Sequence, residues 1–245
     1  MTIGKIFFEE EIDNKDTVEI KGDDFHYLSK VLRVKRGEHI FLIDRKHYYL
    51  SKVVELAKEY ITVQIIEKRV INKVDFKINL YFGLLKADKN DFVIKYATQL
   101  AAYSIHPLVM KRTVIKLSPD EREKRAERYR RIVRDAARDA FLGFAPEVND
   151  IEDLFNKRFD NEGAKILFYE GENLNSLEEI KTEIQKNHSV SILFGPEGGI
   201  EKDELKLLLE NGFCPVSLGE RMVKAETAIM AALSIISFMK KGRLL

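Results

Sequence analysis

Residues 192–238 read ILFGPEGGIEKDELKLLLENGFCPVSLGERMVKAETAIMAALSIISF, and this stretch contains two glycine-bearing loops. The first loop, residues 195–199, lies between an apolar run and an amphipathic segment that predicts a helix. The second loop, residues 217–221, follows another apolar run and leads into a segment of small residues that also predicts a helix. Two loops that each end a strand and begin a helix are typical of the place where an α/β protein builds a ligand site.

The first loop has the glycines of a phosphate-binding loop but lacks its cation. Glycine lets the backbone approach a ligand closely, and the helix that follows offers free N–H groups at its start. However, no Lys-Ser/Thr pair closes the loop, and Glu197 would repel a phosphate. The loop therefore favours a neutral or cationic ligand, and the alternative is a tight strand–helix turn without a ligand.

The second loop adds charged residues to the same candidate site. Gly219 allows a close backbone approach, Arg221 follows it, and Glu226 falls in the first turn of the last predicted helix. Each charge has a structural alternative, because Arg221 can form a salt bridge and Glu226 can simply stabilise a helix N-terminus. Small residues along this helix allow another backbone to pack closely against it.

From Phe76 onward, strands and helices alternate. The apolar strands predict a parallel sheet with helices on both faces, which is the α/β class. Capping boxes at Ser118–Glu121 and Ser176–Glu179 mark two helix starts. The predicted strands are 76–85, 104–110, 164–170, 189–194 and 214–218, and the predicted helices are 88–102, 119–142, 176–186, 201–212 and the segment after residue 225.

The first third of the chain is rich in β-branched and aromatic residues. These residues alternate partially with polar ones and predict the strands 3–8, 39–44, 48–56 and 60–67, interrupted by a short helix near residues 23–32. Several short strands at this spacing indicate a small β-barrel. The barrel ends near Asn72, with a domain boundary at residues 72–75, so the prediction is a domain at 1–72 followed by one at 73–245.

Composition limits the class of protein. The chain has 245 residues and a net charge of +1, which argues neither for nor against nucleic acid, so any RNA-binding surface must come from local clustering. The single cysteine, Cys214, excludes an intramolecular disulfide, and five scattered histidines predict no metal site. Early acidic residues argue against a signal peptide, and no apolar run is long enough to span a membrane. We expect a reduced, cytoplasmic protein.

Three sets of motifs carry a resemblance to a known family. FGPEGGIEKDEL (194–205) followed by SLGERMVKAETAIMAAL (217–233) resembles the paired loops of the 16S ribosomal RNA uridine-N3 methyltransferases, the RsmE family of the SPOUT superfamily. His26-Tyr27-Leu28 with Val31-Leu32-Arg33 and Gly37 resembles the N-terminal pattern of that family. Lys86, Asp88, Lys89 and the run 95–100 resemble its central pattern, so the resemblance covers most of the chain.

The resemblance implies a fold and an activity that the residue pattern alone does not. It implies a PUA-like RNA-binding β-barrel at 1–72 and a SPOUT methyltransferase domain at 73–245 whose α/β fold contains a deep trefoil knot. It also implies S-adenosylmethionine as cofactor, a homodimer with active sites at the interface, and methylation of N3 of one uridine in 16S ribosomal RNA of the small subunit.

Roles for individual residues follow from this reading. Methylation of N3 requires loss of its proton, so catalysis needs a positioned donor, a proton acceptor and a group that stabilises anionic uracil. Arg221 is the candidate for stabilising the anionic uracil or for orienting the phosphate, and Glu197, Glu226 or solvent is the candidate base. The predicted cofactor-binding residues are Leu193, Phe194, Gly195, Gly199, Ile200, Leu218, Gly219, Met222, Val223 and Thr227. The predicted RNA-binding residues are His26, Tyr27, Lys30, Arg33, Lys35, Arg36, Lys86 and Lys89.

The chain departs from the family pattern at three places. Lys224-Ala225 stands where the family usually has Arg-Thr, Glu220 where a proline is common, and residues 136–142 lack polar groups of the family pattern. RNA contacts from that helix are therefore in doubt. A ribose 2′-O-methyltransferase, a non-catalytic RNA-binding protein and a nucleotide-phosphate enzyme are the alternatives, the last disfavoured by the missing lysine.

Overall fold

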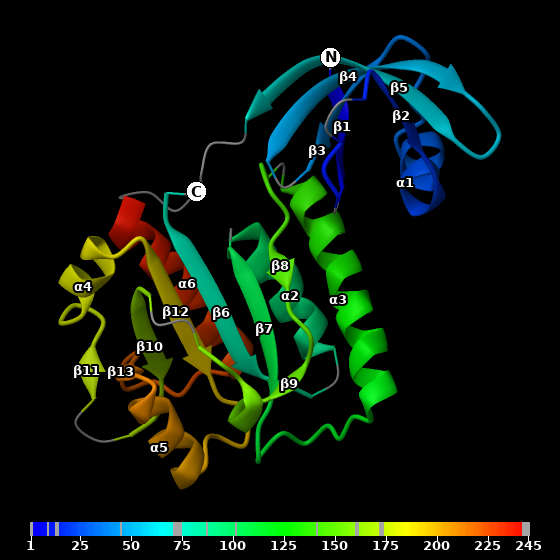
Figure 1. The fold of residues 1–245 in the computed structure, drawn as a ribbon. Coiled ribbons are helices and arrows are strands. Elements are labelled where there is room, and N and C mark those ends of the chain that lie inside the picture. The colour runs from blue at the N-terminus through cyan, green and yellow to red at the C-terminus, as the bar shows by residue number, and fades with distance from the viewer. Residues whose placement is uncertain are drawn as a thin grey trace. The chain divides into compact units, whose positions relative to one another are not determined.

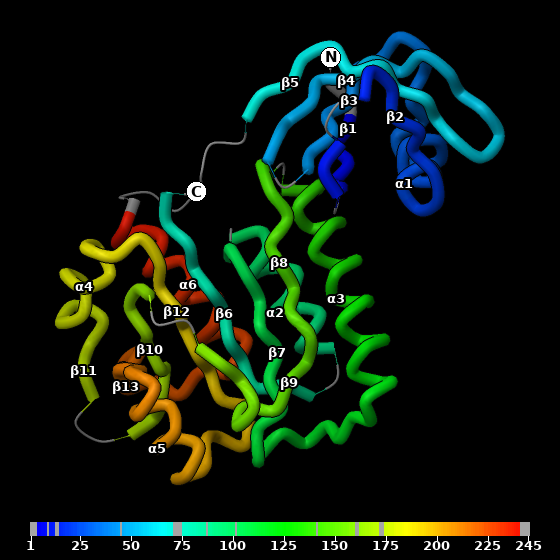
Figure 2. The backbone as a smooth tube through the Cα atoms, in the orientation of Figure 1, coloured from blue at the N-terminus to red at the C-terminus, as the bar shows by residue number. Residues whose placement is uncertain are grey.

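The structure, a computed structural model, describes residues 2–8, 10–12, 15–44, 46–70, 75–86, 88–100, 102–140, 142–159, 162–171 and 174–241. The chain forms two compact units, which Figure 2 traces in sequence order. The first contains Met1–Lys73 and Ala137–Ala145, and the second contains Val74–Ala136 and Pro146–Leu245. Most of the predicted boundary at residues 72–75 lies outside the described residues. The assignment of separate functions to 1–72 and 73–245 stays a prediction.

The first unit is built on a five-stranded sheet. Its strands are β1 (Thr2–Phe7), β2 (Thr17–Ile20), β3 (His39–Ile43), β4 (His47–Leu56) and β5 (Ile61–Val70). Their order is β1-β3-β4-β5-β2, with β1 parallel to β3 and the other pairs antiparallel (Figure 1). The predicted barrel is an open, curled sheet with β1 and β2 at its two ends, and β2 is a strand that the sequence reading missed.

The predicted helix at 23–32 consists of two short turns. An α-helical turn, α1 (Gly22–His26), continues into a π-helical turn, η1 (Tyr27–Val31). The wider turn closes through the hydrogen bond that the Leu32 N–H donates to the Tyr27 carbonyl at 3.0 Å. Arg33 then takes φ +52°, a left-handed conformation that is uncommon for residues other than glycine. Phe25 and Leu28 are buried in the core that the inner face of the sheet also lines.

Asp44, at the turn between β3 and β4, is a buried carboxylate with a full set of donors. Its Oδ2 accepts hydrogen bonds from the Ile12 N–H at 3.0 Å and from the Tyr49 hydroxyl at 2.8 Å. Its Oδ1 accepts from the N–H groups of Lys46 and His47, each at 2.7 Å. Burial raises the pKa of Asp44, but these hydrogen bonds outweigh it and hold the pKa below its usual value of 3.8.

Asp44→Asn should therefore destabilise the first unit by about 2–4 kcal/mol at neutral pH, because the amide NH₂ must face existing donors. A carboxyl whose folded-state pKa is lowered stabilises the fold above its unfolded pKa, and this stability is lost as pH falls through the folded value. Urea unfolding followed by circular dichroism should show that pH dependence, below about pH 4, in the wild type and not in Asp44→Asn. The exposed Asp16→Asn is the control, and an unfolding curve of Asp44→Asn that matches it contradicts the prediction.

The second unit contains a parallel sheet, which confirms the predicted α/β class. The strand order is β11-β13-β10-β12-β6-β7-β8, with β9 also paired to β7, and every described pair is parallel. The short strands β8, β9 and β11 were not predicted. The elements are β6 (Lys77–Gly83), α2 (Lys89–Gln99), β7 (Ser104–Val109), α3 (Pro119–Asp139), β8 (Glu147–Val148), β9 (Glu152–Asp153), η2 (Leu154–Asn156), β10 (Ala164–Phe168), β11 (Asn175–Ser176), α4 (Lys181–Lys186), β12 (Ser189–Phe194), α5 (Lys202–Glu210), β13 (Cys214–Ser217) and α6 (Ala225–Lys241).

The central strands are buried on both faces. Leu193 of β12 packs with Leu208 of α5, and its neighbours Ile192 and Phe194 are buried on the opposite face. Helices α2 and α6 pack against each other and lie together behind the sheet in Figure 1. This arrangement matches strands that read as nearly continuous apolar runs. No helix in the described part of the chain is long and apolar enough to cross a membrane.

The two predicted capping boxes have different outcomes. The Ser118 N–H donates to Glu121 Oε2 at 2.8 Å, and α3 begins at the next residue, Pro119, as predicted. The Ser176 N–H also donates to the carboxylate of Glu179, at 2.5 Å, but α4 begins only at Lys181. The predicted helix start at 176 is therefore wrong, because the intervening residues form turns and Ser176 pairs with β13 as part of β11.

Candidate active site at the carboxyl ends of three strands

Three loops of the second unit leave the same edge of the sheet. Strands β6, β12, β10 and β13 are consecutive neighbours and parallel, so their carboxyl ends meet on one side. The segment between β6 and α2, the loop 195–201 after β12 and the loop 218–224 after β13 all start there. A ligand site at the carboxyl ends of parallel strands is the arrangement that the sequence predicted.

The first loop is a tight turn that requires its glycines. The Gly199 N–H donates to the Pro196 carbonyl at 2.9 Å, and Gly199 has φ +81°. A Cβ on Gly195 would lie 2.7 Å from Ile200 Cγ1, and one on Gly83 would lie 2.5 Å from Pro196 Cδ. The loop therefore packs against the end of β6, and larger residues at these glycines would push the two backbones apart.

Side chains from the end of β7 and from α5 fix this loop. Arg112 donates to the Gly198 carbonyl at 2.9 Å and pairs with Glu201 at 2.7 Å. The fully buried Glu204 accepts hydrogen bonds from the N–H groups of Lys111 and Glu201, which completes a capping box at the start of α5. The sequence reading missed both Arg112 and Glu204. The box had only a weak sequence signal, because Glu201 is not one of the Ser, Thr, Asp or Asn residues favoured at an N-cap, and Arg112 has no local signal.

A charged cluster joins the three loops. Lys89, at the start of α2, lies with its ammonium nitrogen 3.0 Å from Glu197 Oε1 and 3.4 Å from Glu226 Oε2. Glu197 also accepts a hydrogen bond from the Lys86 N–H at 3.1 Å. Glu226 Oε2 is buried and has no hydrogen bond of good geometry in the described structure, although the ammonium is close enough for an ion pair. The two candidate bases of the sequence reading therefore share one cation.

The cluster affects Glu197 and Lys89 in opposite directions. Burial raises the pKa of Glu197, but the hydrogen bonds from the Lys86 N–H and the Lys89 ammonium outweigh it, so the net pKa is below its usual value. The hydrogen bond to Glu197 raises the pKa of Lys89 despite partial desolvation, and Glu226 adds to this effect. Lys89 is therefore a protonated ammonium, and Glu197 is an ionised carboxylate with a low affinity for protons.

The second loop presents its side chains to solvent. Gly219 has φ +119° and its N–H donates to the Ser217 hydroxyl at 3.1 Å. Met222 is 87% exposed, Val223 is 43% exposed, and Arg221 is exposed without a hydrogen bond or ion pair in the described residues. Leu218 is half-buried and Thr227 is exposed. Just before Glu226 of the charged cluster, this loop therefore presents exposed cations and exposed apolar side chains.

Three of the predicted apolar cofactor residues, Leu193, Phe194 and Ile200, have their side chains in the core. Leu193 and Ile200 belong to the cluster beneath α5, and Phe194 stacks on Phe168 with ring centroids 4.6 Å apart. The predicted contact of Leu193 and Ile200 with an adenine stays a prediction.

The predicted RNA-binding residues divide between the two units. His26, Lys30, Arg33, Lys35 and Arg36 are exposed on and after η1 in the first unit, whereas Lys86 and Lys89 lie at the charged cluster of the second. Tyr27 is half-buried, and the Arg138 guanidinium lies 4.8 Å from its ring centroid while also pairing with Asp24. One face of Tyr27 is therefore covered, which limits the predicted base stacking to its other face.

The part of the chain that the structure describes contains no group of three histidine, cysteine, aspartate or glutamate residues arranged to hold a metal ion.

Comparison with known proteins assigns the class. Residues 72–237 match the family profile described as RNA methyltransferase domain, and residues 20–66 match the one described as RNA methyltransferase PUA domain. Since the first match covers more than half of the sequence, the chain belongs to this RNA methyltransferase family.

The relatives are more specific. The chain is 27% identical over 238 residues to the ribosomal RNA small subunit methyltransferase E of Bacillus subtilis, covering 94% of this chain and 93% of that protein. It is also 27% identical to the protein of that name from Aquifex aeolicus, covering 94% of this chain and 98% of that protein. The crystal structure of the Neisseria gonorrhoeae protein of that name bound to S-adenosyl methionine has a TM-score of 0.85 at 24% identity, covering 97% of this chain and 98% of that one. The resemblance to the RsmE family is confirmed.

Proposed function

We propose that this protein transfers the methyl group of S-adenosylmethionine to N3 of one specific uridine in 16S ribosomal RNA of the small subunit. Curated relatives of nearly the same length are named ribosomal RNA small subunit methyltransferase E. The observation that carries the proposal is the pair of glycine loops at the carboxyl ends of β12 and β13, the two strands that flank β10, together with the cluster of Lys89, Glu197 and Glu226.

The site fits a cofactor that carries a sulfonium cation. Two carboxylates, Glu197 and Glu226, face Lys89, and the buried Glu226 Oε2 has no hydrogen bond of good geometry among the described residues. The open surface above Gly219, where an added Cβ would meet nothing within 4 Å, leaves room for a ligand against the backbone. Backbone groups of residues 194–199 and 218–223 would hold the cofactor, and when bound it supplies an electrophilic methyl group.

The residues of this chain then prepare the uridine. The N3 proton must leave before N3 becomes a nucleophile, and negative charge spreads onto the uracil oxygens as it leaves. Glu226 is a better acceptor than Glu197, since Glu197 is already occupied by the Lys86 N–H and by Lys89. The Arg221 guanidinium, which is exposed and has no partner among the described residues, is available to stabilise the anionic oxygens.

The N-terminal unit would bind the RNA through exposed cations after η1. Arg33→Asp together with Arg36→Asp should weaken binding of 16S ribosomal RNA at least about 10-fold and reduce the steepness of its salt dependence, by roughly one per contacted phosphate. Aspartate suits position 33 because it tolerates the left-handed conformation there. Filter binding across a salt series is the measurement, and Lys58→Glu, far along the β4–β5 hairpin, is the control. Unchanged affinity and salt slope would refute this surface.

A homodimer and a knot complete the proposal. Exposed apolar side chains lie on the mutually packed helices α2 and α6, including Phe92 at 44%, Phe238 at 59% and Ile235 at 37% exposed. Such a surface is more apolar than a monomer needs and suits burial against a second copy. Passage of the α6 segment through a loop as a trefoil knot is proposed from the resemblance alone.

Phe238→Asp should convert the dimer to monomers of 28.4 kDa, because the partner would bury an unpaired charge. Light scattering after size-exclusion chromatography measures this, and Leu209→Asp, on the 46%-exposed Leu209 of α5, should leave the dimer intact. A wild-type protein that is monomeric at micromolar concentration, or a Phe238→Asp protein that stays dimeric, contradicts the proposed interface.

Mass spectrometry of ribosomal RNA tests the activity itself. A strain lacking the gene should lose one N3-methyluridine from 16S ribosomal RNA, and purified protein with S-adenosylmethionine should restore it on isolated small subunits. A methyl group restored on a ribose instead would assign a 2′-O-methyltransferase. No restored methyl group together with no cofactor binding by calorimetry would assign a non-catalytic RNA-binding protein.

A further inference from the structure

The outer face of the first unit's sheet is unexpectedly apolar. Along β3 and β4 the inward residues, such as Leu42 and Tyr49, are buried in the core. Phe41, Tyr48 and Leu50 alternate with them and therefore project from the opposite face. On a sheet that packs on only one side this face is normally polar. Two aromatic rings and a leucine there need an explanation.

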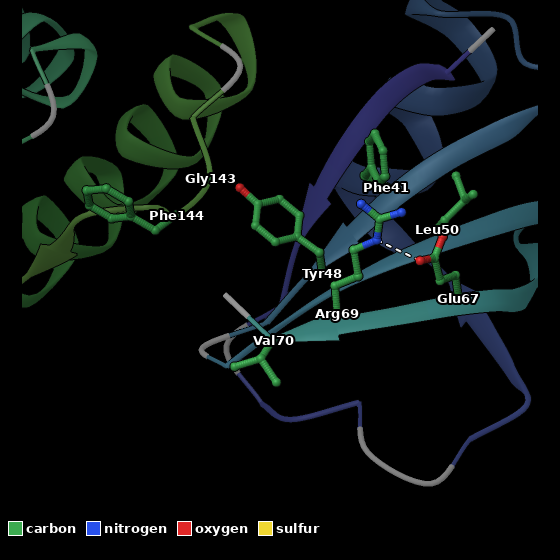
Figure 3. A pocket seen from close by; sticks show the side chains of 8 residues that line it. All are labelled: Phe41, Tyr48, Leu50, Glu67, Arg69, Val70, Gly143 and Phe144. Carbon is green, nitrogen blue, oxygen red and sulfur yellow. Dashed lines mark hydrogen bonds and ion pairs between the residues drawn. The ribbon is translucent and has the colours of Figure 1, made fainter. Parts of the chain in front are cut away.

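Part of this face is covered by the unit's own chain. Ala137, Leu142 and Ala145 pack against Phe7, Ile43 and Tyr48. The Tyr48 hydroxyl points toward Gly143, where an added Cβ would lie only 2.0 Å from it (Figure 3). This close approach fixes the Tyr48 ring beside residues 142–145. The neighbouring part of the face stays open.

The open part is a pocket of about 530 Å³, within the ~300–1,000 Å³ range of small-ligand sites. Strand register places Phe41, Leu50 and Glu67 in one row, and Tyr48 beside Arg69 in the next. The Phe41 and Tyr48 rings meet edge to face, with centroids 6.4 Å apart. Arg69 donates to Glu67 at 2.6 Å, and both stand at the rim with side chains 74% and 46% exposed (Figure 3).

We propose that this pocket binds a single unpaired nucleobase of the RNA substrate. Unpaired bases in RNA are recognised by stacking on aromatic rings and on arginine planes, together with hydrogen bonds to their edges. Phe41 and Tyr48 supply the rings, Arg69 supplies a planar guanidinium, and Glu67 supplies an acceptor beside its donors. The proposal rests on RNA being the substrate of the proposed function.

The charges around the pocket favour RNA over an apolar protein segment. Lys5 pairs in register with Phe41, and Lys52 lies two residues from Leu50 along β4, so both project from the same face as the pocket. The Lys5 ammonium already donates to the Leu142 carbonyl at 3.2 Å, whereas Lys52 is exposed and Arg69 stands at the rim beside Glu67. A base that enters the pocket brings a phosphate on each side, and Lys52 and Arg69 are placed to receive phosphates.

A single tryptophan reports on the pocket directly. The natural sequence contains no tryptophan, so Phe41→Trp in the full chain introduces one fluorophore at the pocket. A mixed-sequence single-stranded RNA should quench it, and an abasic oligomer of the same length should bind about 5- to 100-fold more weakly, the fold-change expected for one stacked base. Leu56→Trp, at the 45%-exposed far end of β4, is the control and should not be quenched.

Kinetics on small subunits that lack the methyl group give the second readout. Phe41→Ala and Arg69→Ala should each raise KM for the subunit about 5- to 100-fold and leave kcat unchanged, whereas Leu56→Ala and Lys58→Ala should behave as wild type. A merely structural role would lower kcat through loss of folded protein.

The outcomes separate this proposal from the proposed function. No quenching of Phe41→Trp, equal quenching by the abasic oligomer, or an unchanged KM in both alanine variants overturns the pocket, including the case in which a protein occupies it. If the wild type methylates no RNA but Phe41→Trp is quenched only by base-containing RNA, the proposed function fails and the pocket stands.

Discussion

Glu226→Gln should lower kcat for uridine methylation by about 100- to 10,000-fold at saturating cofactor, the range attributed to a positioned general base. The Glu226 side chain is only 16% exposed, and its Oε2 is buried without a hydrogen bond of good geometry among the described residues. The Lys89 ammonium lies 3.4 Å from this oxygen. Glutamine keeps the shape of the side chain but cannot accept the N3 proton.

Glu197→Gln is the matched control for Glu226→Gln. Glutamine at 197 can still accept the Lys86 N–H, so we expect a loss of at most about 10-fold, on the scale of one weakened hydrogen bond. Single-turnover methylation with radiolabelled cofactor measures both variants, and added formate should partly rescue Glu226→Ala. If Glu226→Gln keeps full turnover, another group or solvent removes the proton. A larger loss in Glu197→Gln would exchange the roles of the two glutamates.

The fold of the second unit was largely readable because its signals are local. Buried parallel strands appear as apolar runs, and the capping box at Ser118 marks the start of α3. The missed strand β2 has only four residues between charged neighbours, so its pairing with β5 decides it, and no local pattern does. The end of α3 also joins the first unit, where Ala137 is fully buried. A helical pattern shows which residues are apolar but not which core they enter.

The sequence predicted those parts of the site in which the backbone conformation requires a particular residue type. Gly199 and Gly219 have positive φ, which only glycine adopts easily, so their loops were visible in the sequence. The pairing of Lys89 with Glu197 and Glu226 was not visible, because it joins segments more than a hundred residues apart. The sequence does not show which residues a lysine pairs with, and Lys89 was therefore predicted to bind RNA. That role stays a prediction, although the two carboxylates already engage its ammonium.

Arg221→Ala should lower kcat by about 100- to 1,000-fold, the loss typical of removing one group that stabilises a developing oxyanion. Arg221 is exposed and unpaired in the described residues, so its removal breaks no ion pair that the structure shows. Its place two residues after Gly219 puts the guanidinium on the loop that borders the Lys89 cluster. The deficit should therefore appear in turnover and not in the unfolding transition.

Two further variants distinguish oxyanion stabilisation from general attraction of RNA. Arg221→Lys keeps the positive charge but loses the planar fork, and we expect it to recover only part of kcat. Lys202→Ala removes one exposed cation at the start of α5, and its kcat should equal that of the wild type. If Arg221→Ala raises only KM for the subunit, and high RNA concentration restores kcat, Arg221 binds phosphate. The negative charge left by the N3 proton is then stabilised by another cation of the described site, such as Lys224 on the same loop or Lys89.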